Sequence, residues 1–285
     1  MTWDVAVAGT FHSDDLTTPA GRCDALGGSA VYFSLAASRY APVHVNGIVG
    51  EDTVNEYRRI LDRPSIHLDG MVVSSTPTFR WHAVHDFDRW VTAQESSEPG
   101  CDPLWEPTLS EASRRAGVLF VGSMSPALQH RVIDQSGATL IGLDSMSEFI
   151  ASDPDGVRAL VARADVLFLT DGELAGLTGT DDWRASAAGL CGTGRLRAVV
   201  VKRGPNGAAC VTAGGIMEMS AVPVAEVVDP TGAGDALAGG FLGTAAVDER
   251  ADSAVFESAL AEGLGCAADA IVAFGTAGLA ATGTV

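Results

Sequence analysis

Residues 227–241 hold the strongest structural signal in the chain, and they read Val227-Val228-Asp229-Pro230-Thr231-Gly232-Ala233-Gly234-Asp235-Ala236-Leu237-Ala238-Gly239-Gly240-Phe241. This is an apolar strand end, a loop with almost no side chains, and a helix of small residues. Because Gly232, Ala233 and Gly234 leave their backbone N–H groups uncovered at the helix start, the loop predicts an anion site. Asp235 follows at once and would accept a proton beside that anion. An anion hole next to a carboxylate is the minimum equipment for phosphoryl transfer to a hydroxyl.

The seven residues from Asp229 to Asp235 resemble the C-terminal signature of the ribokinase-like (PfkB) carbohydrate kinases. The resemblance implies a ribokinase-like three-layer α/β/α fold with a mostly parallel central sheet and a small β-lid. It also implies an ATP-dependent phosphotransferase with an alcohol acceptor, which uses Mg²⁺ and a monovalent cation such as K⁺ near Asp229. The alternative interpretation of these residues is a Gly-rich turn that caps a helix.

Composition sets the frame for this interpretation. The 285 residues suit one large α/β domain over 1–285, and 47% of them are apolar. The formal charge of −18 argues against nucleic acid or an anionic membrane as partner. The five cysteines are scattered, so neither a zinc site nor a disulfide framework is expected. Without a signal-like start or a run of ~18 apolar residues, we expect a soluble cytoplasmic protein.

Short apolar runs alternate with helical stretches along the chain, which favours a mostly parallel sheet covered on both faces. The runs are continuous rather than alternating, as expected for strands that are buried on both faces. The predicted strands are Val5–Gly9, Val43–Gly50, Val118–Ser123, Thr139–Asp144, Val166–Thr170 and Ala198–Lys202.

The segment 76–97 is polar and aromatic, and its charged turn at 86–89 reads as a hairpin tip. Phe79, Trp81, Trp90 and Thr92 recur at period 2 along its arms. Together with the segment near 14–24, it is expected to form a small β-lid over roughly 11–26 and 72–100. Ribokinase-like enzymes close such a lid over the sugar and so exclude water. The alternatives are a structural hairpin or a flap through which a homodimer forms.

The expected sugar side begins with Gly27 and Gly28, which open a helix that runs to about Arg39. They resemble the family's N-terminal Gly-Gly motif, which touches the sugar hydroxyls. Tyr32 stands where the family commonly has Asn. Asp14 is the first choice for a carboxylate that binds two adjacent hydroxyls, and Asp15 is the second. The expected substrate-binding residues are Asp14, Gly27, Gly28, Tyr32, Trp81 and Asp235.

The expected nucleotide side includes Thr170-Asp171-Gly172-Glu173, which is similar to the family's Asn-x-x-Glu motif. Glu173 would hold Mg²⁺ through water, because Mg²⁺ prefers oxygen ligands. Thr170 and Ser147 both stand where relatives tend to carry Asn, and both departures put the ATP geometry in doubt.

Val201-Lys202-Arg203-Gly204-Pro205-Asn206-Gly207 resembles the family's nucleotide-side turn between two strands. Lys202 or Arg203 would supply positive charge to the triphosphate; alternatively, either residue reaches solvent at a strand end. Residues 265–275 resemble the segment that covers the adenine. The expected nucleotide-binding residues are Thr170, Lys202, Arg203, Gly204, Thr231, Gly232 and Gly234.

The sequence lacks the motifs of other nucleotide-binding protein classes. The only lysine follows Val201, so there is no Walker A loop, and Leu237 stands where a dinucleotide fingerprint needs glycine. Protein-kinase motifs are absent. His82 and His85 are three apart in a predicted strand, so they would point to opposite faces and lie on the lid surface.

These patterns favour an ATP-dependent kinase of a sugar, a cyclitol or a sugar derivative, with Asp235 as base and the N–H groups of Gly232, Ala233 and Gly234 around the phosphoryl group. The aromatic residues Tyr32, Phe79 and Trp81 slightly favour a nucleoside, cyclitol or modified sugar. A nucleoside kinase on the same fold is the first alternative. A catalytically weakened binding protein, suggested by Thr170 and Ser147, is the second.

Overall fold

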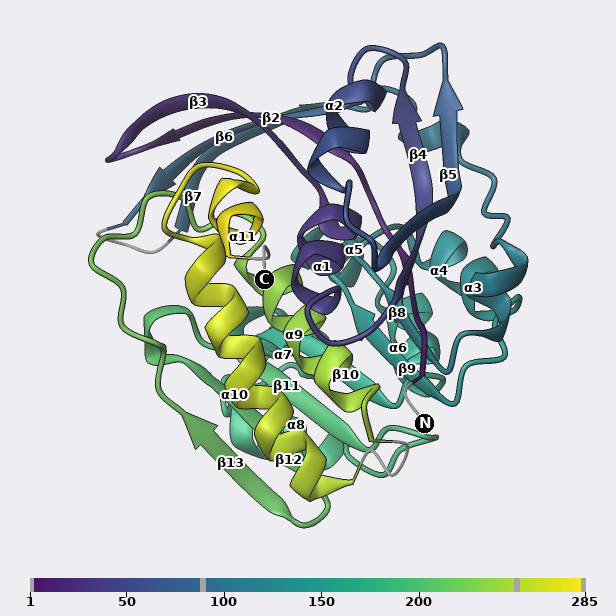
Figure 1. Cartoon of the computed structure of the whole chain (residues 1–285). Coiled ribbons are helices and arrows are strands. Elements are labelled where there is room, and N and C mark those ends of the chain that lie inside the picture. Colours follow the sequence, from purple (N-terminus) through teal and green to yellow (C-terminus); the bar gives the residue numbers. More distant parts are fainter. Residues whose placement is uncertain (1–2, 88–90, 249–251, 283–285) are drawn as a thin grey trace.

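A nine-stranded sheet forms the centre of the computed structural model, which describes residues 3–87, 91–248 and 252–282 (Figure 1). The strand order is β13-β12-β11-β10-β9-β8-β1-β4-β5. Every pairing from β11 to β5 is parallel, and the pairings β11–β12 and β12–β13 are antiparallel. The strands are β1 (Val5–Ala8), β4 (Val43–Gly50), β5 (Ile66–Ser74), β8 (Val118–Val121), β9 (Leu140–Asp144), β10 (Val166–Thr170), β11 (Ala198–Lys202), β12 (Ala208–Thr212) and β13 (Gly215–Met219).

Helices cover both faces of this sheet, and the fold is the three-layer α/β/α arrangement that the sequence predicts. One face is covered by α1 (Ser29–Ala37), α2 (Val54–Ile60), α9 (Ala233–Ala245), α10 (Ser253–Ala270) and α11 (Ala277–Ala281). The other face is covered by α3 (Glu111–Arg115), α4 (Pro126–Ile133), α5 (Ser147–Ser152), α6 (Pro154–Val161), α7 (Asp171–Thr178) and α8 (Trp183–Leu190). Two short 3₁₀ helices, η1 (Asp102–Leu104) and η2 (Gly204–Asn206), lie in connecting segments.

The small residues of α9 let this helix lie between two neighbours. A Cβ on Gly239 would lie 2.5 Å from the carbonyl oxygen of Phe33 in α1, and one on Gly240 would lie 2.8 Å from Cys266 Sγ in α10. The Phe241 ring contacts the core ring of Phe168 edge to face at 5.5 Å. This packing fixes the start of α9, which is the predicted anion site.

A second sheet of four strands lies apart from the main sheet, in the order β3-β2-β6-β7. Its strands are β2 (His12–Thr18), β3 (Gly21–Gly27), β6 (Phe79–Asp86) and β7 (Val91–Glu98). Figure 1 shows it as a curved layer that projects from one side of the molecule. Trp90 and residues 88–89 of the predicted hairpin tip lie outside the described residues.

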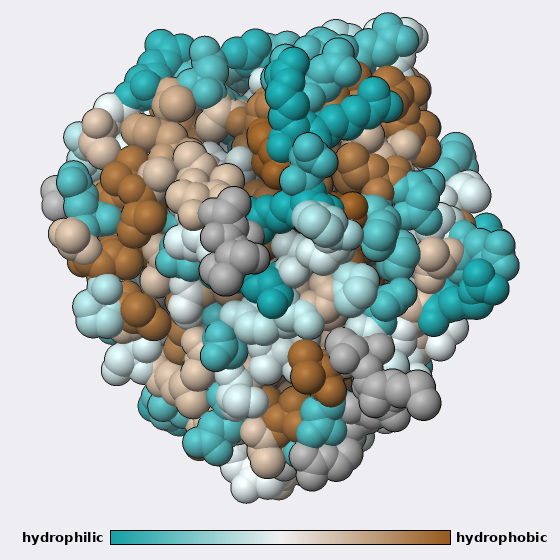
Figure 2. All heavy atoms as spheres, in the orientation of Figure 1, coloured by the Kyte–Doolittle hydropathy of each residue, from teal (hydrophilic) through white to brown (hydrophobic). Residues whose placement is uncertain are grey.

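Strand bounds agree with the sequence predictions to within two residues, because the predicted runs are the apolar segments buried on both faces. The helix α1 ends at Ala37, two residues before its expected end, and residues 265–270 of the segment expected to cover the adenine form the last turns of α10. In the described part of the chain, no helix is long and apolar enough to span a bilayer. Hydrophilic and hydrophobic residues are interspersed over the face shown in Figure 2.

Candidate active site

The predicted anion loop lies at the start of α9. Gly232 caps this helix with a φ of 75°, in the left-handed region that favours glycine. A Cβ there would also lie 2.3 Å from the ring of Tyr32. The first N–H groups of a helix have no intrahelical acceptor, so those of Gly232 and Gly234 are available to an anion. The N–H of Ala233, which was also expected to bind the anion, instead donates to the carbonyl oxygen of Pro230 at 3.3 Å.

Asp229 fixes this loop through two hydrogen bonds to backbone N–H groups. It is fully buried, its Oδ1 accepts the N–H of Thr231 at 2.9 Å, and its Oδ2 accepts the N–H of Gly275 at 2.9 Å. A single carboxylate therefore joins the anion loop to the segment that follows α10.

Asp235 lies in the first turn of α9. Burial and then the negative charge of Asp144 raise the pKa of Asp235 to about 7. A carboxylate with a pKa near neutrality is suited to accept a proton at physiological pH. The structure thus places a candidate base next to the anion loop.

Lys202, at the end of β11, lies against the same loop. Its Nζ is 2.8 and 3.1 Å from the two carboxylate oxygens of Asp144, and 3.2 Å from the position of a Cβ on Gly234. Burial alone would lower the pKa of Lys202, but Asp144 and Glu173 hold it above its usual value. A permanent positive charge therefore lies beside the anion loop.

Thr170 and Glu173 cap the start of α7. The Thr170 hydroxyl accepts the N–H of Glu173 at 3.1 Å, and Glu173 Oε2 accepts the N–H of Thr170 at 2.7 Å. This reciprocal pair is a capping box, which needs Ser or Thr followed three residues later by Glu or Gln. This cap was not predicted from the sequence, although Thr-x-x-Glu before an apolar helix is a recognisable pattern. It explains why Thr170 is acceptable where relatives tend to carry Asn.

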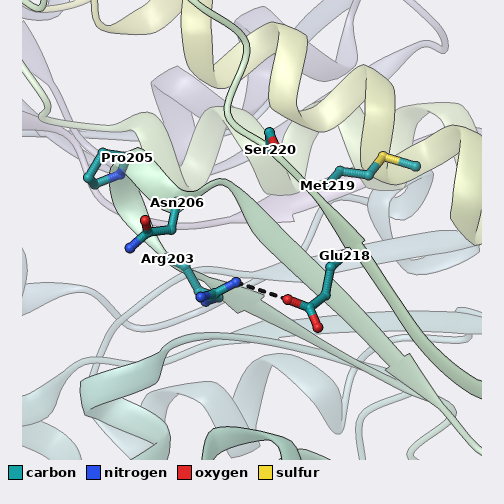
Figure 3. A pocket seen from close by; sticks show the side chains of 6 residues that line it. All are labelled: Arg203, Pro205, Asn206, Glu218, Met219 and Ser220. Atoms are coloured by element: carbon teal, nitrogen blue, oxygen red, sulfur yellow. Dashed lines mark hydrogen bonds and ion pairs between the residues drawn. The ribbon is translucent and has the colours of Figure 1, made fainter.

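Arg203 points away from Lys202, as expected for successive residues at the end of a strand. Figure 3 shows it directed to Glu218, with Nη1 3.2 Å from Oε2, in a pocket of about 340 Å³ lined also by Pro205, Asn206, Met219 and Ser220. The guanidinium also lies 5.0 Å from the ring of Trp183. Gly204 begins η2 with a φ of 53°. Of the two predicted cations, only Lys202 lies at the anion loop.

On the sugar side, Asp14 is 1% exposed and neither carboxylate oxygen has a hydrogen-bond partner among the described residues. The Tyr32 hydroxyl is equally buried and also without a partner there. A Cβ on Gly27 would lie 2.7 Å from Asp14 Oδ2 and 3.3 Å from the Tyr32 hydroxyl. Burial, with a smaller effect from the charge of Asp229, raises the pKa of Asp14 to about 8. Asp15 instead faces the other side of the small sheet, where it pairs with Arg22.

The Gly-Gly motif permits this close approach. Gly28 has a φ of 101°, and a Cβ on it would lie 2.3 Å from the carbonyl oxygen of Thr10. The register β2–β6 sets Trp81 opposite Asp14, so the two side chains share one face of the small sheet. The structure therefore gathers Asp14, Gly27, Tyr32 and Trp81 around one region.

His12 and Asp102 also reach this region, and the sequence analysis did not identify them. His12 Nδ1 lies 3.9 Å from Asp14 Oδ1, and Nε2 lies 4.0 Å from Asp102 Oδ2. Burial lowers the pKa of His12 to about 4 and raises that of Asp102 to about 7. Period 2 in the strand could have linked His12 to Asp14, but no local pattern marks Asp102.

The small sheet contacts the anion loop. His85 Nε2 lies 3.2 Å from the Thr231 hydroxyl, and the Thr18 hydroxyl donates to the carbonyl oxygen of Val228 at 2.8 Å. The expectation that His85 lies on the lid surface is wrong: it is half-buried, because strict alternation along β6 places it on the same face as Trp81, whose ring centre lies 5.9 Å from that of His85. His82 remains on the outer face, 3.3 Å from Asp15.

Comparisons with known proteins place the chain among sugar and nucleoside kinases. A cytidine kinase of Thermococcus kodakarensis is 28% identical over 247 residues, which cover 84% of this chain and 87% of that protein. An aminoimidazole riboside kinase of Salmonella typhimurium is 30% identical over 149 residues, 51% of this chain and 46% of that protein.

The same fold occurs in a solved structure at lower identity. A fructokinase double mutant from Vibrio cholerae, in a form with fructose, ADP and potassium ion bound, has a TM-score of 0.79 at 22% identity, covering 98% of this chain and 95% of that one. The sequence model of the pfkB family of carbohydrate kinases matches residues 108–281 of this chain. The chain therefore belongs to the pfkB family of carbohydrate kinases, and it is a phosphotransferase that acts on hydroxyl groups.

Proposed function

We propose that this phosphotransferase moves the γ-phosphoryl group of ATP to a hydroxyl of a small polyhydroxy substrate: a sugar, a cyclitol or a sugar derivative. The observation that carries the proposal is the buried Asp14 carboxylate, which has no donor among the described residues. A buried carboxylate needs hydrogen-bond donors, and two adjacent hydroxyls supply them. Tyr32 links this position to the anion loop, because its ring lies against Gly232.

The proposed reaction uses the residues at the start of α9. The substrate hydroxyl oxygen attacks the γ-phosphorus, a new P–O bond forms, and the bond from the γ-phosphorus to the bridging oxygen breaks to release ADP. The hydroxyl proton passes to Asp235. The N–H groups of Gly232 and Gly234 stabilise the charge on the transferred group, together with that of Ala233, which would exchange its bond to Pro230 for one to the phosphoryl group.

On the nucleotide side, we propose that Lys202 and the Thr231 hydroxyl bind the phosphates. The turns at Thr170 and Gly204 would lie next to the bound nucleotide, and the pocket at Arg203 would form the outer edge of the nucleotide site. The ion pair of Lys202 with Asp144 supports this assignment, since it holds the ammonium group against Gly234.

Mg²⁺ fits the donors near Lys202. Asp144 and Glu173 offer carboxylate oxygens close enough to affect the pKa of Lys202, although Glu173 Oε2 already caps α7. The described residues form no cluster of three or more acidic, histidine or cysteine ligands. Mg²⁺ usually keeps several waters and binds substrate phosphates with one or two carboxylates, so Glu173 and Asp144 would hold it through water. Bound there, it would neutralise phosphate charge.

A monovalent cation such as K⁺ is proposed beside Asp229. Among the described residues, no lysine or arginine pairs with this buried carboxylate, and buried charges are normally paired or bound to a metal. The Vibrio cholerae fructokinase was solved with a potassium ion.

We also propose that the small sheet of β2, β3, β6 and β7, which falls within the predicted segments of roughly 11–26 and 72–100, is a lid over the substrate. Its contacts with Thr231 and Val228 support closure against the anion loop. The exposed Val84 of β6 supports a homodimer formed through the lid. All five cysteines are free thiols, which supports a reducing cytoplasmic location.

A nucleoside kinase is the second candidate function. The two relatives at 28% and 30% identity are named for cytidine and for aminoimidazole riboside, and both of these are ribosides. The aromatic rings of Tyr32, Phe79 and Trp81 offer flat surfaces for a base. The alternative of a catalytically weakened binding protein has less support. It was suggested partly by Thr170, and Thr170 has a structural role as the cap of α7.

The first test is ADP release from Mg·ATP across pentoses, hexoses, inositols and nucleosides, with Asp235→Asn beside the native protein. We expect release that depends on one acceptor class and that falls about 10²- to 10⁴-fold in the variant. Calorimetry of ATP binding shows whether the variant still takes up nucleotide. Native protein that binds ATP but releases no ADP with any acceptor would contradict the proposed function.

A further inference from the structure

We propose that Asp102, set across the His12 ring from Asp14, forms a second acceptor position that binds an amino group on the base of a nucleoside substrate. This inference rests on the kinase function proposed above. It narrows the substrate class to ribosides whose aglycone carries an exocyclic amino group.

The fold places Asp14, His12 and Asp102 in a row. His12 and Asp14 are two residues apart in β2, so their side chains share the inner face of the small sheet. Asp102 begins η1, soon after β7 returns to the main body. The imidazole lies between the two carboxylates, with Nδ1 3.9 Å from Asp14 and Nε2 4.0 Å from Asp102. Both distances are too long for a hydrogen bond.

This row has too few hydrogen-bond donors. Both oxygens of Asp14 and the Oδ1 of Asp102 are buried without a partner among the described residues. The two lid arginines lie on the opposite face of the small sheet, where Arg22 pairs with Asp15 and Arg80 with Asp24. His12 is uncharged at neutral pH, so its ring carries a single N–H. A ligand must therefore supply several donors over a distance greater than an imidazole ring.

A single pair of sugar hydroxyls does not meet this requirement. Adjacent hydroxyls match the two oxygens of Asp14, but Asp102 lies beyond the opposite edge of His12. The second donor must come from another part of the substrate. Aromatic surfaces line the same face, since the Phe79 ring lies 4.3 Å from the His12 ring and Trp81 is opposite Asp14 in the register. A flat base is the aglycone that suits such a wall.

The chemistry of Asp102 favours an amino group over a carbonyl. An amino group on a base has N–H donors to give, and such donors stabilise the ionised form of the Asp102 carboxyl, which only accepts hydrogen bonds. A keto oxygen at the same position would repel that ionised form, and it could be bound only at the cost of protonating the carboxyl. Sites built to bind an N–H or O–H group reject analogues that lack it far more strongly than apolar pockets reject a missing methylene.

The test compares nucleosides that differ only at this group. We would measure kcat/KM of the native protein for cytidine against uridine and for adenosine against inosine, with ribose as a third arm. The best acceptor is expected to carry the amino group, with kcat/KM about 100-fold above that of its keto partner, the order expected for a hydrogen bond to a charged group. Equal rates within both pairs, or ribose as the best acceptor, would overturn the inference while the kinase function stands.

The variant Asp102→Asn assigns the effect to this residue. An amide can present either its oxygen or its NH₂ group, so the preference for the amino nucleoside is expected to fall at least 10-fold, with the keto partner gaining activity. Asp155→Asn is the matched control, because Asp155 is 94% exposed on α6. An unchanged preference in a folded Asp102→Asn protein would contradict the assignment. No activity of the native protein on any acceptor would instead remove the proposed function, and this inference with it.

Discussion

The phosphate side and the sugar side of this molecule satisfy their polar groups in opposite ways. Around the anion loop, Asp229 accepts two backbone N–H groups, Lys202 pairs with Asp144, and Thr170 exchanges hydrogen bonds with Glu173. Around Asp14, the buried carboxylate, the Tyr32 hydroxyl and one oxygen of Asp102 have no partner among the described residues.

The difference separates two tasks. Groups that stabilise a developing charge work best when they are fixed before the reaction, and the phosphate side is held by its own hydrogen bonds. A specificity site obtains discrimination when its buried polar atoms are paired only by the correct substrate. The comparison therefore predicts that changes on the phosphate side cost stability, and that changes on the sugar side cost selectivity.

The largest loss of stability is expected from Lys202→Met. It would leave Asp144 buried without its cation, and breaking such a pair typically costs about 3–5 kcal/mol of unfolding free energy. ATP binding should weaken as well. Chemical denaturation and calorimetry with ATP measure the two effects.

The double variant Lys202→Met with Asp144→Asn is the control, since it removes both charges. It should recover most of the stability but not the affinity for ATP. If Lys202→Met is as stable as the native protein, the phosphate side is not organised by this pair.

Asp14→Asn tests the opposite expectation on the sugar side. Because the pKa of Asp14 is raised to about 8 in the folded chain, above its ordinary value of 3.8, the folded state holds this proton more tightly than the unfolded state. The free energy of unfolding should therefore fall as the pH rises from about 4 to about 8, by an amount on the order of a few kcal/mol. Asn has no such proton, so the variant should lose this part of the slope.

Thermal unfolding of both proteins at pH 5 and pH 8 checks this prediction. Asp102 and Asp235 also have raised pKa values, so the difference between native and variant is the relevant quantity. The variant should also bind its acceptor more weakly while binding ATP normally. Identical slopes for the two proteins would show that Asp14 is not held as the structure indicates.

The features that could be predicted from the sequence are those whose residues lie close together along the chain. Continuous apolar runs identify the buried strands, and the run from Asp229 to Asp235 locates the anion loop, because glycines and a following carboxylate are contiguous there. Asp14 could be proposed from its position after the first strand. The Thr170–Glu173 cap could also have been read, since both partners lie within four residues.

The remaining features depend on contacts between distant segments. Asp102 meets His12 only because the chain that follows β7 returns to the start of β2. His85 reaches Thr231 only because the face of β6 that also carries Trp81 lies against the anion loop. Arg203 turns to Glu218, which belongs to another strand. None of these pairings has a signal within one segment of the sequence.

His85→Ala tests whether the two sides communicate through the lid. The bond from His85 to Thr231 is one hydrogen bond, so its loss should lower kcat about 5-fold, in line with ~1 kcal/mol per bond. The KM for the acceptor should change less than kcat. His82→Ala is the matched control on the outer face, and it should leave both constants unchanged. Equal effects of the two variants would mean that His85 acts only through lid stability.

Thr170→Ala and Thr170→Asn are expected to have the smallest effects, and they test whether the departure from the family's Asn is structural. Alanine removes the cap of α7 and should cost about 1 kcal/mol of unfolding free energy, whereas asparagine caps a helix as well as threonine does. The loss of stability should appear in denaturant melts without a matching fall in kcat, because the Thr170 hydroxyl bonds to Glu173 and holds α7. A Thr170→Asn variant with clearly faster turnover than the native protein would show instead that the hydroxyl limits the contact with ATP, and that this part of the phosphate side is not fully preorganised.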